Sequence, residues 1–199
     1  MSSTQTVMLP TGAPATSAMR PAERPKSLQG LRIGLLDNGK EFSDLVLEAL
    51  ADVLRRDHGA TSIKFWRKGF PAKGAPFIAE MAAETDVAIS GVGHCGSSSP
   101  WSVIDAVNLE KAGVPAVALI SRSFCPLGQI VARGEGHDSL PIVMLPHPIG
   151  EADQAKIAQK GADAAAECVR LLTTPGETVG AEYAAKKFPL PEHAVPRGR

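Results

Sequence analysis

The strongest constraint on the fold is an alternation of short apolar runs with segments of helical periodicity. The runs span residues 32–36, 62–66, 87–92, 114–120 and 141–145, and most are continuous rather than interrupted by polar residues. Strands have this composition when they are buried on both faces, as in a parallel sheet. Apolar residues recur at helical spacing in residues 42–54, 77–82, 103–109 and 157–172.

This alternation predicts one α/β domain over residues 31–173. Parallel strands joined by helices need right-handed crossovers, which place helices on both faces of the sheet. The simplest arrangement is a five-stranded parallel, doubly wound sheet of flavodoxin-like order 2-1-3-4-5. A chain of 199 residues suits a single domain of this kind.

Both ends of the chain are rich in proline. Residues 1–30 contain four prolines and lack the apolar block of a secretory signal, so we predict a flexible arm. Helical periodicity fades after Thr173, and we predict that residues 174–199 form a tail without regular structure. Such ends are candidates for contacts with a second copy or a partner subunit.

Composition argues against several classes of protein. Lys plus Arg and Asp plus Glu both total 21, so no net charge attracts nucleic acid or an anionic membrane. No apolar run approaches the ~18 residues that a bilayer requires. Three cysteines do not make a disulfide framework, and we expect a reducing, cytoplasmic setting. The expected partner is a small-molecule substrate.

Cys95 is the leading candidate for a catalytic residue. It follows the predicted strand 87–92 and precedes a helix-like stretch that begins near Ser102. Unpaired N–H groups and the positive dipole end of a helix favour a thiolate. A buried, inert thiol is the alternative, but the flanking glycines, three serines and His94 favour a nucleophile.

Other chemically competent side chains also follow predicted strands. In an open parallel sheet the ligand crevice lies at the carboxyl ends of the strands. The opposite connections carry ordinary turn residues, and this asymmetry argues for an active site at the carboxyl ends. The candidates are Asp37, Asn38 and Lys40 after the first strand, His94 to Ser98 after the third, Arg122, Ser123 and Cys125 after the fourth, and His147 after the fifth.

Several of these residues have structural alternatives. Asp37 and Asn38 suit an ordinary strand-to-helix turn as well as a substrate contact made by Asn38 and Lys40. The serines 97–99 are expected to cap the following helix, and the backbone of Gly96 allows a ligand to approach closely. His147 lies between two prolines and is either a general acid/base or structural.

Cys125 is a candidate second thiol, because the strand before it is predicted to lie beside the strand that carries Cys95. Two facing thiols would suit proton transfer, addition to a double bond, or a disulfide. A zinc site at His94, Cys95, Cys125 and His147 is disfavoured, since their spacing matches no short zinc motif. We expect neither a metal nor a cofactor. Cys168 lies on the apolar stripe of the last helix and is expected in the core.

The segment around Cys95 resembles the UGSC family, named for a Sec-Gly-Ser-Cys motif that also occurs with Cys in the first position. The resemblance rests on Gly93-His94-Cys95-Gly96-Ser97-Ser98, Trp101-Ser102-Val103, Asp105-Ala106, Val114-Pro115 and Leu145-Pro146-His147-Pro148, and it covers residues 31–150. It implies a reactive chalcogen at position 95. A further likeness to aspartate/glutamate racemases and maleate isomerases is one of architecture only.

Two positions depart from the family motif. Ser98 stands in place of the second cysteine, so a disulfide cycle needs Cys125 or an external thiol. His94 stands in place of Asp, but neighbouring residues point apart, which makes His147 the better expected partner of the thiol.

The leading hypothesis is a thiol-dependent enzyme in which Cys95 attacks a small anionic metabolite, by hydrolysis, lyase or addition chemistry, or isomerisation. A thiol oxidoreductase and a binding subunit completed by a partner are the alternatives.

Overall fold

The computed structural model describes residues 19–69 and 71–190. Their elements, in chain order, are β1 (Arg32–Asp37), α1 (Ser43–His58), β2 (Ser62–Arg67), α2 (Ile78–Glu84), β3 (Val87–Gly93), α3 (Ser98–Lys111), β4 (Ala116–Ser121), the 3₁₀ turn η1 (Arg122–Phe124), α4 (Cys125–Gly134), β5 (Ile142–Leu145), α5 (Gln154–Thr173) and α6 (Gly176–Ala185). The five strands form one sheet of order β2-β1-β3-β4-β5, and all neighbouring strands are parallel. The predicted fold and strand order are confirmed.

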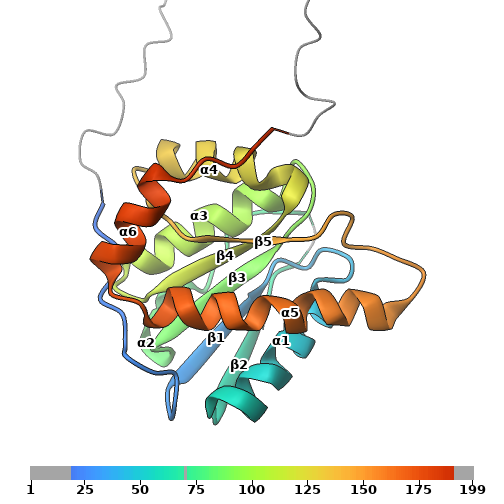
Figure 1. Ribbon diagram of the computed structural model, residues 1–199, viewed down its shortest axis with the longest axis horizontal. Helices are drawn as coiled ribbons and strands as arrows, with labels where there is room; N and C mark the ends of the chain where they lie inside the picture. Colours follow the sequence, from blue (N-terminus) through green and yellow to red (C-terminus); the bar gives the residue numbers. More distant parts are fainter. Residues whose placement is uncertain (1–18, 70, 191–199) are drawn as a thin grey trace, which may run out of the picture.

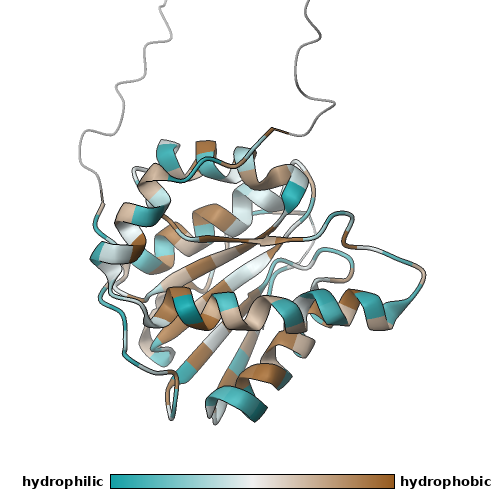
Figure 2. Ribbon diagram, in the orientation of Figure 1, coloured by the Kyte–Doolittle hydropathy of each residue, from teal (hydrophilic) through white to brown (hydrophobic). Residues whose placement is uncertain are grey.

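Helices cover both faces of the sheet (Figure 1). Helices α1 and α5 pack together on one face, while α2, α3 and α4 lie on the other. Colouring by hydropathy shows apolar residues along the central strands and hydrophilic residues on the outer sides of the helices (Figure 2). The sheet therefore lies between two helical layers, and in open sheets of this kind ligands bind at the carboxyl ends of the strands.

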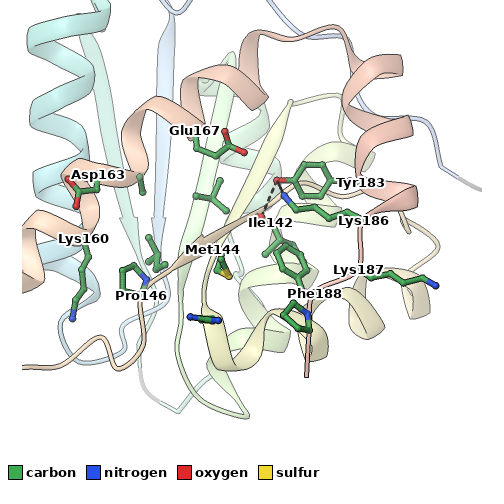
Figure 3. Close-up of a pocket in the computed structure, with 15 residues that line it drawn as sticks. Ile142, Met144, Pro146, Lys160, Asp163, Glu167, Tyr183, Lys186, Lys187 and Phe188 are labelled. Atoms are coloured by element: carbon green, nitrogen blue, oxygen red, sulfur yellow. Dashed lines mark hydrogen bonds between the residues drawn. The ribbon is translucent and has the colours of Figure 1, made fainter. Parts of the chain in front are cut away.

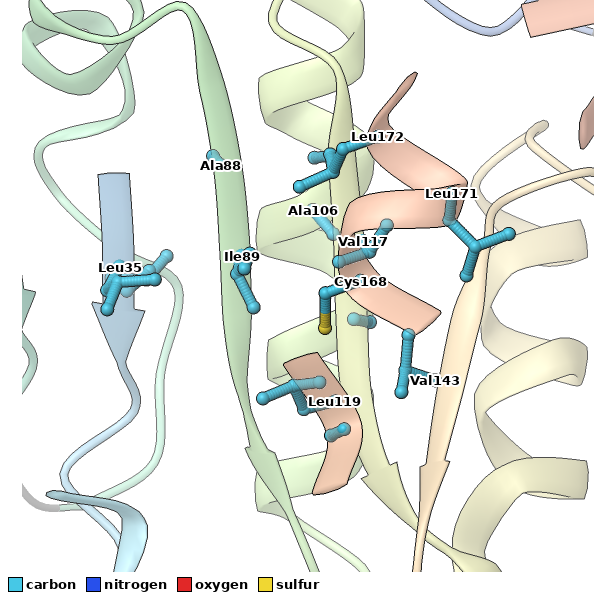
Figure 4. Close-up of a cluster of buried hydrophobic side chains, with 14 of the residues drawn as sticks. Leu35, Ala88, Ile89, Ala106, Val117, Leu119, Val143, Cys168, Leu171 and Leu172 are labelled. Atoms are coloured by element: carbon cyan, nitrogen blue, oxygen red, sulfur yellow. The ribbon is translucent and has the colours of Figure 1, made fainter. Parts of the chain in front are cut away.

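Part of the core fills the space between the sheet and α5 (Figure 4). Leu35, Ile89 and Leu119 from neighbouring strands are fully buried, as is Cys168 on α5. The expectation that Cys168 is a core residue is confirmed. Gly161 lets α5 approach α1 closely, because a Cβ atom there would lie 1.9 Å from the carbonyl oxygen of Val46.

Burial differs between the central and the edge strands. Every residue of β3 and β4 is buried, as their continuous apolar runs predict. In β2, by contrast, only Trp66 is buried, because β2 lies at the sheet edge and only β1 pairs with it. The opposite edge strand, β5, leaves Met144 48% exposed.

The predicted domain boundaries differ from the structure at both ends. Residues 19–30 belong to the predicted arm, but Arg24 and Leu28 are buried there. Arg24 forms an ion pair with Glu110 of α3 at 2.9 Å, and both side chains are fully buried. At the other end, residues of the predicted tail form α6, whose Tyr183 is buried and donates a hydrogen bond to the carbonyl of Ile142.

The domain thus includes residues on both sides of the predicted span 31–173. The remainder of the predicted arm and tail, residues 1–18 and 191–199, lies outside the described residues. Within the described part of the chain, no helix combines the length and the apolarity needed to cross a membrane.

Candidate functional site

The turn that carries Cys95 joins the end of β3 to the start of α3. Gly93 allows β3 and α3 to approach each other closely, since a Cβ atom at this position would lie 2.7 Å from the Cα atom of Ser99. The side chain of Cys95 is partly exposed, whereas Cys125 and Cys168 are buried. Cys95 is therefore the accessible thiol among the three cysteines.

Three donors surround the sulfur atom of Cys95. The Ser98 backbone N–H donates to Sγ at 3.3 Å, and the hydroxyl oxygens of Ser98 and Ser97 lie 3.0 and 3.4 Å from it. The Ser98 hydroxyl also accepts the backbone N–H of His94 at 3.1 Å, which leaves its own hydrogen for the sulfur. A thiolate can only accept, so both hydroxyls serve as its donors.

These donors determine the ionisation of Cys95. Burial alone disfavours the thiolate, but the hydrogen bonds from Ser97 and Ser98 outweigh it and lower the pKa of Cys95 from 9.0 to about 7. Roughly half of the thiol is then ionised near neutral pH. The predicted ionisation of Cys95 thus has a local structural cause.

The serines do not cap α3 as the sequence suggested. Ser97 occupies the capping position but makes no capping hydrogen bond with its side chain. Cys95 supplies the capping acceptors instead: its sulfur accepts the Ser98 N–H, and its carbonyl accepts the Ser99 N–H at 3.2 Å. The helix terminus and the thiolate therefore stabilise each other.

His94 is half-buried beside this turn. Its Nε2 atom lies 3.1 Å from the carbonyl oxygen of Glu41, and since a carbonyl only accepts, Nε2 carries the hydrogen. Burial is the main cause that lowers the pKa of His94, and the charges of Lys40 and His147 lower it further. The ring is therefore neutral near pH 7, and its Nδ1 atom, which has no hydrogen-bond partner among the described residues, can accept a proton.

His147 lies at the carboxyl end of β5 and is exposed. Its Nδ1 atom is 3.2 Å from the hydroxyl oxygen of Ser121, the last residue of β4. Its ring packs edge-on against Phe124 with centroids 5.9 Å apart. The contact with Ser121 places His147 at the carboxyl edge of the sheet, the edge that also carries the Cys95 turn.

The two cationic candidates have different positions. Lys40 is half-buried and acts electrostatically on His94. Arg122 is exposed at the end of β4, which pairs with β3 in a register that places Ile120 beside Gly93. Ser123 follows in η1 and is half-buried. Both cations thus belong to the edge of the sheet that carries Cys95.

Asp37 and Asn38 have the structural role that was the alternative, that of a strand-to-helix turn. The Asp37 carboxylate accepts the Gly39 N–H at 2.8 Å and lies 3.3 Å from Nε of Arg67. Burial, the largest cause, raises the pKa of Asp37 despite these contacts. Asn38 is buried, and protein groups occupy all of its side-chain hydrogen-bonding positions. The structure therefore does not support a substrate contact by either residue.

Cys125 does not face the site as a second accessible thiol. It is fully buried at the start of α4, and its sulfur points at the carbonyl oxygens of Ile120 and Ser121, 3.5 and 3.6 Å away. Burial raises the pKa of Cys125 to about 12. A strand-end position was a correct expectation, but the helix turns this side chain into the core.

A buried ion pair beside the site was not predicted from the sequence. The ammonium group of Lys68, at the end of β2, pairs with Asp105 of α3, and both side chains are almost fully buried. Lys68 also donates to the carbonyl of Lys73, and Asp105 accepts the Ala75 N–H, each at 2.9 Å. The pair fastens the segment after β2 to α3. The available signal in the sequence was Asp105, a carboxylate flanked by the apolar residues Val103, Ile104, Ala106 and Val107.

A separate groove runs along the outer edge of β5 (Figure 3). It has a volume of about 470 Å³, and Met144, Phe188 and Pro146 are among its apolar lining residues. Tyr183 also lines the groove and donates a hydrogen bond to the carbonyl of Ile142 (Figure 3). Arg122, which follows β4, lines the groove as well. None of residues 93–98, which form the Cys95 turn, lines this groove.

Within the described part of the chain, no three His, Cys, Asp or Glu side chains are grouped to hold a metal ion. The side chains around Cys95 suit covalent chemistry by a thiolate with a neutral imidazole in the same turn.

Comparison with known proteins identifies the family. No curated protein matches the sequence. Among solved structures, the flavodoxin-like domain of a Synechococcus protein is similar at 15% sequence identity with a TM-score of 0.34, and the match covers 69% of this chain and 97% of that one. Because this score is low, the fold assignment rests on the strand order. The model of the UGSC family matches residues 6–174, a longer span than the expected 31–150. The chain therefore belongs to the UGSC family.

Proposed function

We propose that this protein is a thiol-dependent enzyme in which the Cys95 thiolate attacks a small anionic substrate. The observation that carries the proposal is the three-donor environment that lowers the pKa of this accessible thiol to about 7. Such a thiolate is both populated and nucleophilic at neutral pH.

The donors around the sulfur have a second role in this mechanism. When the thiolate bonds to an electron-poor carbon, its charge passes to the substrate. The Ser97 and Ser98 hydroxyls and the Ser98 N–H then lose their acceptor and become available to the new negative charge. The exposed backbone of Gly96 leaves room for the substrate in this turn.

We assign the general-base role to His94, the neighbour of Cys95 in the turn, rather than to His147. Its neutral ring holds its hydrogen on Nε2 towards Glu41, so Nδ1 is the atom that takes up or returns a proton. His147 is a second acid/base candidate at the same edge, and its contact with Ser121 fixes the orientation of its ring. Lys40 and Arg122 would orient an anionic group.

The position of the motif's second cysteine argues against an internal disulfide cycle. Ser98 occupies it and contacts Cys95 as a hydroxyl donor. The other two thiols are buried, and burial raises the pKa of each. A redox function would therefore depend on an external thiol, so we propose nucleophilic rather than redox catalysis.

A pair of matched alkylating agents tests both the nucleophile and the anion preference. Iodoacetate and iodoacetamide differ mainly in charge, so the ratio of their rates with Cys95, divided by the same ratio for free cysteine, reports the local field. We expect a several-fold preference for iodoacetate that falls in Lys40→Met and Arg122→Met and remains in the exposed control Lys111→Met. A ratio equal to that of free cysteine would overturn the anionic-substrate assignment, and labelling that persists in Cys95→Ser would overturn the nucleophile.

A further inference from the structure

Asn38 makes the most complete side-chain contacts at the carboxyl edge of the sheet. Its Nδ2 atom donates to the carbonyl of Val92 at 2.6 Å and to the hydroxyl of Ser102 at 2.9 Å. Its Oδ1 atom accepts the Lys40 N–H at 3.0 Å and the Ser43 hydroxyl at 3.1 Å. Two donors and two acceptor positions are the full capacity of a carboxamide, so none is left for a substrate.

These four contacts join four segments of the chain. Asn38 follows β1, Ser43 begins α1, Val92 lies near the end of β3, and Ser102 lies one helical turn after Ser98 in α3. The side chains of Asn38, Ser43 and Ser102 are all buried, so water does not compete for these hydrogen bonds. The Asn38 backbone N–H adds a further link, to the carbonyl of Gly91 at 2.8 Å.

The two donor contacts have a particular relationship to Cys95. Val92 lies three residues before Cys95, and Ser102 lies seven residues after it. The amide group therefore bridges the two segments between which the Cys95 turn is held. The distances from the sulfur to Ser97 and Ser98 depend on how these segments are placed, and a displacement of a few tenths of an ångström weakens a hydrogen bond.

We propose that Asn38 is a positioning residue for Cys95, whose side-chain amide clamps the end of β3 to α3 and thereby holds the sulfur against its donors. This inference rests on the proposed function, in which Cys95 is the reacting atom. Asn38 touches neither the sulfur nor the expected substrate, so its effect is transmitted through Val92 and Ser102.

Asn38→Asp removes the donor contacts of the side chain and keeps its acceptor contacts. An aspartate keeps oxygen acceptors for Lys40 and Ser43 but has no N–H for the Val92 carbonyl, which it would instead repel. The readout is the rate of Cys95 alkylation by iodoacetamide as a function of pH, because the midpoint of this profile reports the ionisation of the thiol. We expect the midpoint to move upward by about one pH unit as the donors lose their alignment, with the high-pH plateau retained.

Two further variants keep the test decisive. Ser102→Ala removes one donor contact with little change in volume, and it should move the midpoint in the same direction if Asn38→Asp does not fold. Glu110→Gln disturbs a buried polar group at the opposite edge of the sheet, and it should lower the melting temperature without moving the midpoint.

The possible results distinguish the proposed function from the positioning role of Asn38. A wild-type midpoint near 9 would overturn the proposed function itself. A wild-type midpoint near 7 that Ser102→Ala leaves in place would overturn the positioning role alone, even where Asn38→Asp moves it, because the charge of an aspartate raises the pKa of a nearby thiol by itself. An equal upward movement in Glu110→Gln would also overturn it, because general loss of stability would then explain the effect.

Discussion

The hydroxyl oxygen of Ser98 lies 3.0 Å from the sulfur of Cys95 and accepts the backbone N–H of His94 at the same time. This arrangement directs the hydroxyl hydrogen at the sulfur and makes Ser98 a fixed donor to a thiolate. In the family motif this position belongs to a cysteine. Because a serine stands at this position, the turn has one thiol, that of Cys95, with a hydroxyl beside it.

Removal of this hydroxyl should make Cys95 less acidic. In Ser98→Ala the sulfur loses one donor and keeps the Ser98 N–H and the Ser97 hydroxyl, so its pKa should rise by about one pH unit from its value near 7. The thiolate is the deprotonated form, so less of it is present at pH 7. The measurement is the pH midpoint of Cys95 alkylation.

Ser99→Ala is the matched control for that variant. The Ser99 hydroxyl is buried, and no hydrogen-bond partner for it exists among the described residues. Its removal should leave the midpoint unchanged. Equal movements in both variants would show that helix packing, rather than a donor to sulfur, sets the acidity.

Restoration of the motif's second cysteine should create a redox couple. In Ser98→Cys the new sulfur replaces the hydroxyl oxygen that lies 3.0 Å from the sulfur of Cys95, within the reach of a disulfide. Mild oxidation should then remove two free thiols per chain and lower the mass by the two hydrogens lost. The wild-type chain under the same conditions should keep Cys125 and Cys168 reduced, and simultaneous loss of two thiols there would contradict the single-thiol site.

His94 should affect turnover but not the ionisation of Cys95. None of the hydrogen bonds that lower the pKa of Cys95 comes from the imidazole; they come from Ser97 and Ser98. In His94→Gln the alkylation midpoint should therefore stay near 7, while any proton-transfer step that uses Nδ1 slows. A midpoint that rises towards 9 would indicate a thiolate–imidazolium pair instead.

The buried pair of Arg24 and Glu110 should stabilise the attachment of the N-terminal segment. Glu110 also accepts the N–H groups of Ala22 and Ala116 at 2.6 and 2.7 Å. Glu110→Ala leaves Arg24 buried without a counter-charge, and we expect a loss of about 3–5 kcal/mol in the free energy of unfolding. Denaturant unfolding measures it.

An exposed ion pair on the same molecule provides the comparison. Lys111 and Glu135 lie 3.6 Å apart with side chains 44% and 36% exposed. Glu135→Ala should cost less than about 1 kcal/mol. Similar losses in the two variants would mean that the buried pair has no special role.

The fold was predictable because the central strands are buried on both faces. The continuous apolar runs of β3 and β4 correspond to strands in which every residue is buried. Helix α6 was missed because Pro175 and Gly176 suggested a tail, whereas the burial of the helix's own Tyr183 attaches it to the core. Burial that depends on tertiary packing in this way is difficult to predict from the local sequence.

The site was only partly predictable for the same reason. The turn that carries Cys95 is a local feature of residues 93–98, and its residues indicate a reactive thiol. The role of Asn38 depends on partners up to 64 residues away along the chain, and no local pattern reveals them. Cys125 was misassigned because its position after a strand does not determine which way a helix turns the side chain.

The most direct test of a reactive Cys95 is intact-mass analysis with peptide mapping after limiting iodoacetamide across a pH series. The structure predicts a single modification, located on Cys95, with a midpoint near pH 7. First labelling of Cys125 or Cys168, or a Cys95 midpoint near the ordinary value of 9, would contradict a stabilised thiolate at this position.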